Sequence, residues 1–69
     1  MSFSSDNLII GLDVEGSTKY LSDVDVDELT YLINDSQDDA QVFNVKDGAK
    51  ALSALRGNEP EKTFLAIPV

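Results

Sequence analysis

The 69-residue chain contains no cysteine, no histidine and no tryptophan. Without cysteine, neither a disulfide nor a thiolate-bound metal can stabilise the fold. Without cysteine and histidine together, the chain cannot build a Ser-His-Asp or Cys-His catalytic arrangement, or a zinc site of the usual ligands. A chain this short also has little room to enclose a small-molecule pocket. We therefore expect a protein that is not an enzyme and that binds no metal or other cofactor.

Basic residues are scarce, because five Lys and Arg stand against thirteen Asp and Glu, for a net charge of −8. A field of this sign repels phosphate groups, so direct binding to nucleic acid or to an anionic membrane is not expected. No apolar run approaches the ~20 residues of a membrane span, and the first residues lack the pattern of a secretory signal. These absences predict a cytoplasmic protein whose partner is another protein with a basic surface.

The most apolar segment covers residues 7–14, where Leu8, Ile10, Leu12 and Val14 alternate with other residues. Alternate side chains of a strand point to the same face, so this segment predicts the central β-strand of the fold. Residues 15–17 have turn chemistry, and residues 18–21 suit a second short strand. We therefore expect a β-hairpin at this point, with a strand followed by a loop as the alternative.

Residues 25–35 have the features of a helix. Asp25 stands three residues before Glu28, which is the spacing of side chains that cap a helix N-terminus. Apolar residues follow at helical spacing, from Val26 through Leu29 to Leu32 and Ile33. The sequence thus predicts a helix with one face in the core.

Further along the chain, residues 41–45 form a short strand candidate. Asp47 is a candidate N-cap for an alanine-rich helix over residues 47–56, with Gly57 as its stop signal, although Asp47-Gly48 also suits a hairpin turn. Residues 63–67 predict the last strand. We therefore expect a single α+β domain over residues 1–69, with residues 1–6 frayed. Its expected architecture is a small sheet of three to four strands with two helices on one face, in the order β-β-α-β-α-β.

The C-terminal strand, from Thr63 to Ile67, is followed by Pro68. Proline cannot donate to a β-ladder, and it is therefore typical of an edge strand. An edge strand offers its backbone to another chain, so this strand predicts a homodimer that pairs through it.

Acidic residues are concentrated in the middle of the chain. We expect them to form one acidic face that docks a basic partner, as in an adaptor, an inhibitor or an assembly component. The same face would imitate the phosphates of DNA toward a nucleic-acid-binding protein. Seven residues make up this expected face: Asp23, Asp25, Asp27, Glu28, Asp35, Asp38 and Asp39.

One short motif favours a different function. The six residues Asp13-Val14-Glu15-Gly16-Ser17-Thr18 resemble the first metal-binding loop of class III nucleotide cyclases. The resemblance implies Asp13 as a Mg²⁺ ligand, with the backbone of Glu15, Gly16, Ser17 and Thr18 cradling phosphate. The alternative function is thus a Mg²⁺/phosphate-binding or vestigial nucleotide-handling domain. The simpler interpretation of the same residues is a glycine-containing hairpin turn.

Overall fold

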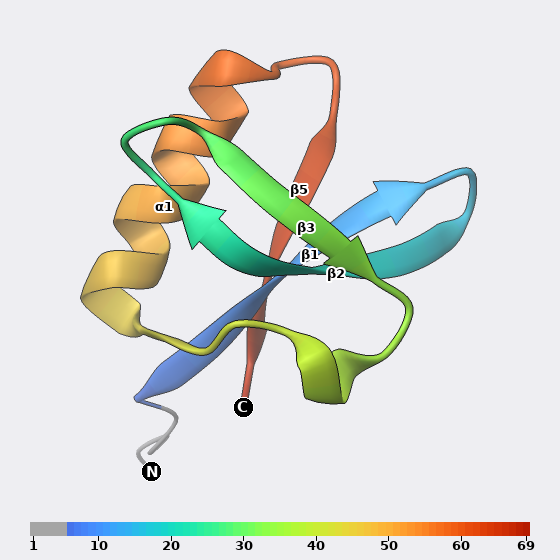
Figure 1. The fold of residues 1–69 in the computed structure, drawn as a ribbon, viewed down its shortest axis with the longest axis horizontal. Helices are drawn as coiled ribbons and strands as arrows, with labels where there is room; N and C mark the ends of the chain where they lie inside the picture. The colour runs from blue at the N-terminus through green and yellow to red at the C-terminus, as the bar shows by residue number, and fades with distance from the viewer. Residues whose placement is uncertain (1–5) are drawn as a thin grey trace, which may run out of the picture.

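A computed structural model describes residues 6–69, and Figure 1 shows their fold. These residues form five strands, one α-helix and one short 3₁₀ helix. The elements are β1 (Asn7–Val14), β2 (Ser17–Asp25), β3 (Thr30–Asn34), η1 (Gln37–Asp39), β4 (Phe43–Asn44), α1 (Val45–Asn58) and β5 (Thr63–Pro68). The prediction that residues 1–6 are frayed lies, apart from residue 6, outside the described residues.

The sheet is antiparallel throughout and is built around β1. In the described residues the order is β3-β2-β1-β4, and β5 pairs with β1 as well. Leu8 is paired with both Phe43 and Pro68, so β4 and β5 lie on opposite sides of β1. The sheet is strongly twisted, and in Figure 1 the β2–β3 hairpin crosses in front of β1 and β5, with α1 to one side.

The core confirms that β1 is the central strand. Leu8, Ile10 and Leu12 point to one face and pack in a cluster with α1 and the neighbouring strands. The cluster is completed by Leu21, Phe43, Ala51, Leu52, Leu55 and Phe64. On the other face of β1, Ile9 is also buried. A Cβ atom at Gly11 would lie 2.8 Å from Cδ1 of Ile67, so glycine at this position allows Ile67 to pack across β1.

The predicted hairpin between β1 and β2 is present. Val14 pairs with Ser17, and the two residues between them both have positive φ, +50° at Glu15 and +84° at Gly16. Two successive left-handed residues are the signature of a type I′ turn, whose twist matches that of the flanking strands. β2 continues to Asp25, well beyond the expected end at residue 21.

The predicted helix over residues 25–35 is wrong, because this segment forms the turn and the second strand, β3, of a hairpin with β2. Asp25 does accept hydrogen bonds from the amides of Asp27 and Glu28, at 3.0 and 3.1 Å, as a helix cap would. The same local bonds also suit a turn. Leu29 then adopts a left-handed φ of +57°, which ends any helix, and β3 pairs back with β2. The described residues therefore contain one α-helix of more than one turn rather than two.

The second predicted helix is confirmed as α1, which is longer at both ends than residues 47–56. Its N-cap is Asn44, whose side chain accepts a 2.7 Å hydrogen bond from the amide of Asp47. Gly57 lies inside the helix and not beyond its end, and the cap is Glu59. The strand expected at residues 41–45 is reduced to the two residues of β4, whereas β5 matches the expected strand. No helix in residues 6–69 has the length and apolar character needed to cross a membrane.

Candidate functional site

Charge is distributed unevenly between the two parts of the chain. Residues 6–44 contain ten of the thirteen carboxylates but only one of the five basic residues, Lys19. Residues 45–69, which form α1 and β5, contain three carboxylates and four basic residues. The net negative charge therefore belongs to the first three strands and the loop that follows them.

The seven acids of the expected face lie in two groups, one at each end of β3. Asp23, Asp25, Asp27 and Glu28 lie at the end of β2 and in the turn that leads into β3. Asp35, Asp38 and Asp39 follow the other end of β3 and extend into η1. All seven are exposed. We call these seven residues and the strand between them the acidic hairpin; five strand residues, or about 15 Å, separate its two groups.

The first acidic group is ordered by hydrogen bonds within its own turn. Asp25 fixes the turn through its bonds to the amides of Asp27 and Glu28. Asp23 has a positive φ of +49°, and the pairing of β2 with β3 shifts register between Ser22 and Asp25. Such a bulge re-aims the side chains near it. The carboxylates of Asp27 and Glu28 are thus presented on an ordered turn.

The second acidic group is anchored to β2. Lys19 donates to Asp35, and Asn34 donates a 2.6 Å hydrogen bond to the hydroxyl of Ser22. Ser36 caps η1 by accepting from the amide of Asp38, at 3.2 Å. Asp38 and Asp39 are the acidic residues in the first turn of η1. This group is therefore also ordered, with one of its three charges paired to a lysine.

A shallow groove of about 380 Å³ lies beside the first acidic group. Its apolar wall is made by Val24, Val26, Val42 and Phe43, and Val42 is 57 % exposed. Asp27 from the turn and Asp47 from α1 line it as well, together with Lys50. The side chain of Gln41 holds the groove in shape by accepting a 2.6 Å hydrogen bond from the amide of Val24. The groove thus combines apolar surface with two carboxylates and one lysine.

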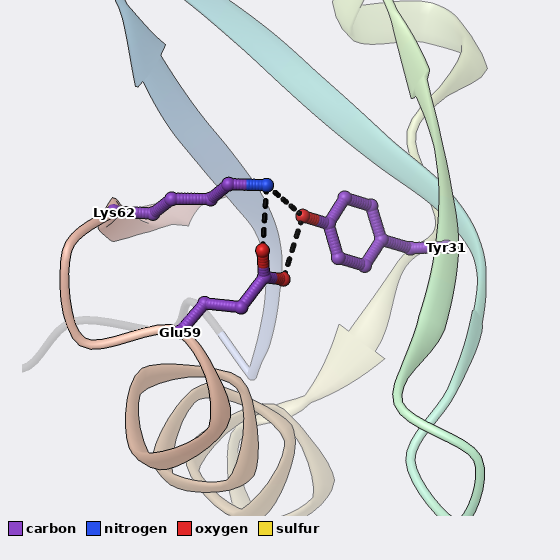
Figure 2. Close-up of polar contacts among 3 residues, drawn as sticks. All are labelled: Tyr31, Glu59 and Lys62. Atoms are coloured by element: carbon purple, nitrogen blue, oxygen red, sulfur yellow. Dashed lines mark hydrogen bonds and ion pairs between the residues drawn. The ribbon is translucent and has the colours of Figure 1, made fainter.

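A polar cluster joins β3 to the segment between α1 and β5 (Figure 2). The hydroxyl of Tyr31 donates to Glu59 at 2.9 Å, and the ammonium of Lys62 donates to both partners, at 3.2 Å to Tyr31 and 2.6 Å to Glu59. Burial raises the pKa of Tyr31, and its bond to Glu59 adds to the rise, against the opposing effect of Lys62. The bond from Lys62 lowers the pKa of Glu59, and its bond to Glu59 raises the pKa of Lys62. All three shifts favour the same charge state, with Tyr31 neutral, Glu59 negative and Lys62 positive.

The motif from Asp13 to Thr18 lies at the tip of the β1–β2 hairpin. Asp13, Glu15, Gly16, Ser17 and Thr18 are all exposed there. The two positive φ angles show that Glu15 and Gly16 form the hairpin turn. Within residues 6–69, no three acidic side chains gather in a way that would hold a metal ion. Binding of Mg²⁺ or phosphate by these residues stays a prediction.

The sequence alone did not reveal the groove or the cluster. Both join residues that are far apart in the chain, Val24 with Val42 and Tyr31 with Glu59. The prediction of a helix over residues 25–35 also placed Tyr31 on the wrong element. No family model matches the chain, and no curated protein or solved structure is significantly similar to it.

Proposed function

We propose that the protein is a small, non-enzymatic binding module that docks a basic surface of a partner protein on its acidic hairpin. The observation that carries the proposal is the segregation of charge: ten carboxylates and one lysine lie in residues 6–44. Seven of these acids border one exposed strand, β3, at both of its ends.

The rigidity of the acidic hairpin supports the proposal. The hydrogen bonds that Asp25 accepts in the turn, and the one that Ser36 accepts at η1, hold the two acidic groups in place before a partner arrives. A preorganised surface loses less conformational freedom on binding than a flexible one. Complementary charge also steers a basic partner toward the surface and excludes acidic ones.

The groove supports the same function because it offers apolar contact next to carboxylates. Lys and Arg carry long apolar stems below their charged ends. A stem can lie against Val24 and Val42 while the charged end approaches Asp27 or Asp47, which line the same groove. A basic segment of a partner therefore fits this surface better than a purely apolar one.

The test is a selection of random displayed peptides on the full chain, followed by affinity measurements on the selected peptides. We expect selected peptides to be rich in Lys and Arg. Neutralising acids of the acidic hairpin, by Asp27→Asn with Glu28→Gln or by Asp38→Asn with Asp39→Asn, weakens binding by about tenfold, which corresponds to about 1.4 kcal/mol.

A matched control is available on the other hairpin. Asp13→Asn with Glu15→Gln removes the same number of charges from exposed positions outside the acidic hairpin. We expect this variant to bind within about twofold of the unmodified chain, since the two residues lie outside the docking surface. Selected peptides without basic residues, or an equal loss in the control variant, would contradict the proposal.

A further inference from the structure

Two outer strands of the sheet, β5 and β3, differ in how they present their backbone. In an antiparallel pair, residues alternate between pointing their N–H and C=O groups toward the partner strand and away from it. Directly after β5, the amide of Val69 donates a 3.1 Å hydrogen bond to the carbonyl of Asn7, which fixes this alternation along β5. Thr63, Leu65 and Ile67 therefore point toward β1, and Phe64, Ala66 and Pro68 point to the outer edge.

The outer edge of β5 is closed at both ends. Arg56 of α1 donates a 2.7 Å hydrogen bond to the outward carbonyl of Phe64. Pro68 has no N–H group to offer at its outward position. Only Ala66 presents both backbone groups along this edge. The predicted homodimer through Thr63 to Ile67 is therefore not supported by the structure of β5.

The alternation in β3 follows from the β1–β2 turn. In a two-residue hairpin the flanking pair, here Val14 and Ser17, is hydrogen-bonded, so odd-numbered residues of β2 up to Leu21 point toward β1. The carbonyl of Leu21 indeed accepts a 2.9 Å bond from Gln41 on that side. Tyr20 and Ser22 then point toward β3 and pair with Asn34 and Leu32.

It follows that Ile33, and Tyr31 beyond it, point their N–H and C=O groups to the outer edge of β3. Among residues 6–69, no other strand pairs on that side. Two apolar side chains of β3 are exposed, 57 % for Leu32 and 48 % for Ile33. Neither a proline nor an arginine closes this edge in the way that the edge of β5 is closed.

We propose that the outer edge of β3 takes up an extended segment of the partner as an additional strand, with an apolar centre and basic residues on both sides. The inference rests on the proposed function and specifies how the partner binds. Backbone bonds to Tyr31 and Ile33 supply affinity, and alternate side chains supply specificity. The carboxylates at the two ends of β3 then meet the basic residues that flank the apolar centre.

Charge determines which chain pairs with β3. A second copy would place the acids after β3 of one chain beside the acids before β3 of the other, since two identical strands pair antiparallel about a twofold axis. Each chain carries a net charge of −8, so this arrangement is repulsive. A partner segment with basic residues on both sides of its apolar centre places opposite charge beside these acids, so it meets no such repulsion.

The test uses a basic peptide obtained in the selection above and three variants of the full chain. Ile33→Pro removes the outward N–H of β3 without removing a bond to β2, and we expect an affinity loss of at least about tenfold. Ile33→Ala shortens the side chain but keeps the N–H, so it loses only about twofold to threefold. Ala66→Pro makes the equivalent change on the edge of β5 and leaves affinity unchanged. Circular dichroism and amide NMR spectra of each variant verify that it is folded.

The outcomes separate the binding mode from the function. Equal binding by Ile33→Pro and the unmodified chain overturns strand addition but leaves the acidic docking surface in place. Equal binding by both of two peptides, one N-methylated at its odd residues and the other at its even residues, overturns it as well, because one of the two has the N–H groups of its pairing edge blocked. Sedimentation could instead show a dimer that is lost in Ile33→Pro. That result identifies a second copy of the chain as the occupant of the edge, and it overturns the proposed binding of a partner segment. If the selection enriches no basic peptide, the proposed function fails and the inference fails with it.

Discussion

The hydroxyl of Tyr31 donates a 2.9 Å hydrogen bond to the carboxylate of Glu59, twenty-eight residues further along the chain. This contact ties the edge strand β3 to the end of α1. The ring of Tyr31 also meets Phe64 edge to face, with 6.1 Å between ring centroids. The acidic hairpin is therefore linked to the core through Tyr31.

Tyr31→Phe keeps the ring contact with Phe64 and removes only the hydroxyl. We expect the free energy of unfolding to fall by about 1 kcal/mol, the usual net value of one hydrogen bond. Tyr31→Ala also removes the packing against the core and costs about 3 kcal/mol. Urea denaturation measures both. Equal losses in the two variants would show that the hydroxyl, and not the ring, makes the main contribution.

Stability falls at high pH because of the same cluster. The folded state raises the pKa of Tyr31 above 10.0 and that of Lys62 above 10.5. The stabilisation is fully present below pH 10 and is lost as the pH rises through the raised values, when Tyr31 becomes charged and Lys62 neutral. Thermal unfolding between pH 9 and pH 11 should show a steeper decline for the unmodified chain than for Tyr31→Phe. Parallel declines would contradict the role of Tyr31.

The stability contributed by Glu59 has the opposite pH dependence, because it is lost when the pH falls. The folded state lowers the pKa of Glu59 below 4.5, chiefly through the bond from Lys62. Its contribution is present above pH 4.5 and is lost as the pH falls through the lowered value. Glu59→Gln cannot titrate, so its stability between pH 5 and pH 3 should decline less than that of the unmodified chain. An identical acid profile in the two proteins would contradict the ion pair.

Two glycines of α1 respond in opposite ways to alanine. A Cβ atom at Gly48 would lie 2.5 Å from Cδ1 of Leu8, whereas one at Gly57 would meet nothing within 4 Å. Gly57→Ala should stabilise the chain by about 0.5–1 kcal/mol through helix propensity. Gly48→Ala gains the same propensity but overpacks the core, for a net loss of about 1–2 kcal/mol. Urea denaturation distinguishes them, and a stabilised Gly48→Ala would show that Leu8 moves without cost.

We expect salt to stabilise the fold, because like charges crowd residues 6–44. Raising the ionic strength from about 50 mM to about 1 M shortens the Debye length from more than 10 Å to about 3 Å. Weaker repulsion should raise the free energy of unfolding by about 1 kcal/mol, or roughly 4–8 °C in Tm. The variant Asp38→Asn with Asp39→Asn should show a smaller rise in a calorimetric scan. A Tm that is independent of salt would mean that repulsion is negligible.

Local patterns in the sequence were sufficient where they agreed with the pairing of strands. Apolar residues at every second position over residues 8–14 predicted β1, residues 15–17 predicted the hairpin turn, and the alanines after Asp47 predicted α1. Over residues 25–35, however, apolar residues fit both a helix and a strand. Pairing with β2 decided the outcome, and Thr30, Tyr31 and Ile33 are residues that favour strands.

The candidate site was predictable only in part. The acids from Asp23 to Asp39 were identified from composition, but a helix would have placed them on different faces. Their separation by β3 depends on the turn at Leu29, whose positive φ no pattern indicated. The groove and the outward groups of Ile33 depend on strand register, which contacts distant in the sequence determine.

The most direct test of docking on the acidic hairpin is an amide NMR titration of the isotope-labelled full chain with a selected basic peptide. We expect shift changes to concentrate in residues 23–43 and around Asp47, which lines the groove, whereas residues 13–18 and the second half of α1 remain unchanged. Changes centred on residues 13–18, or spread evenly over the molecule, would contradict it.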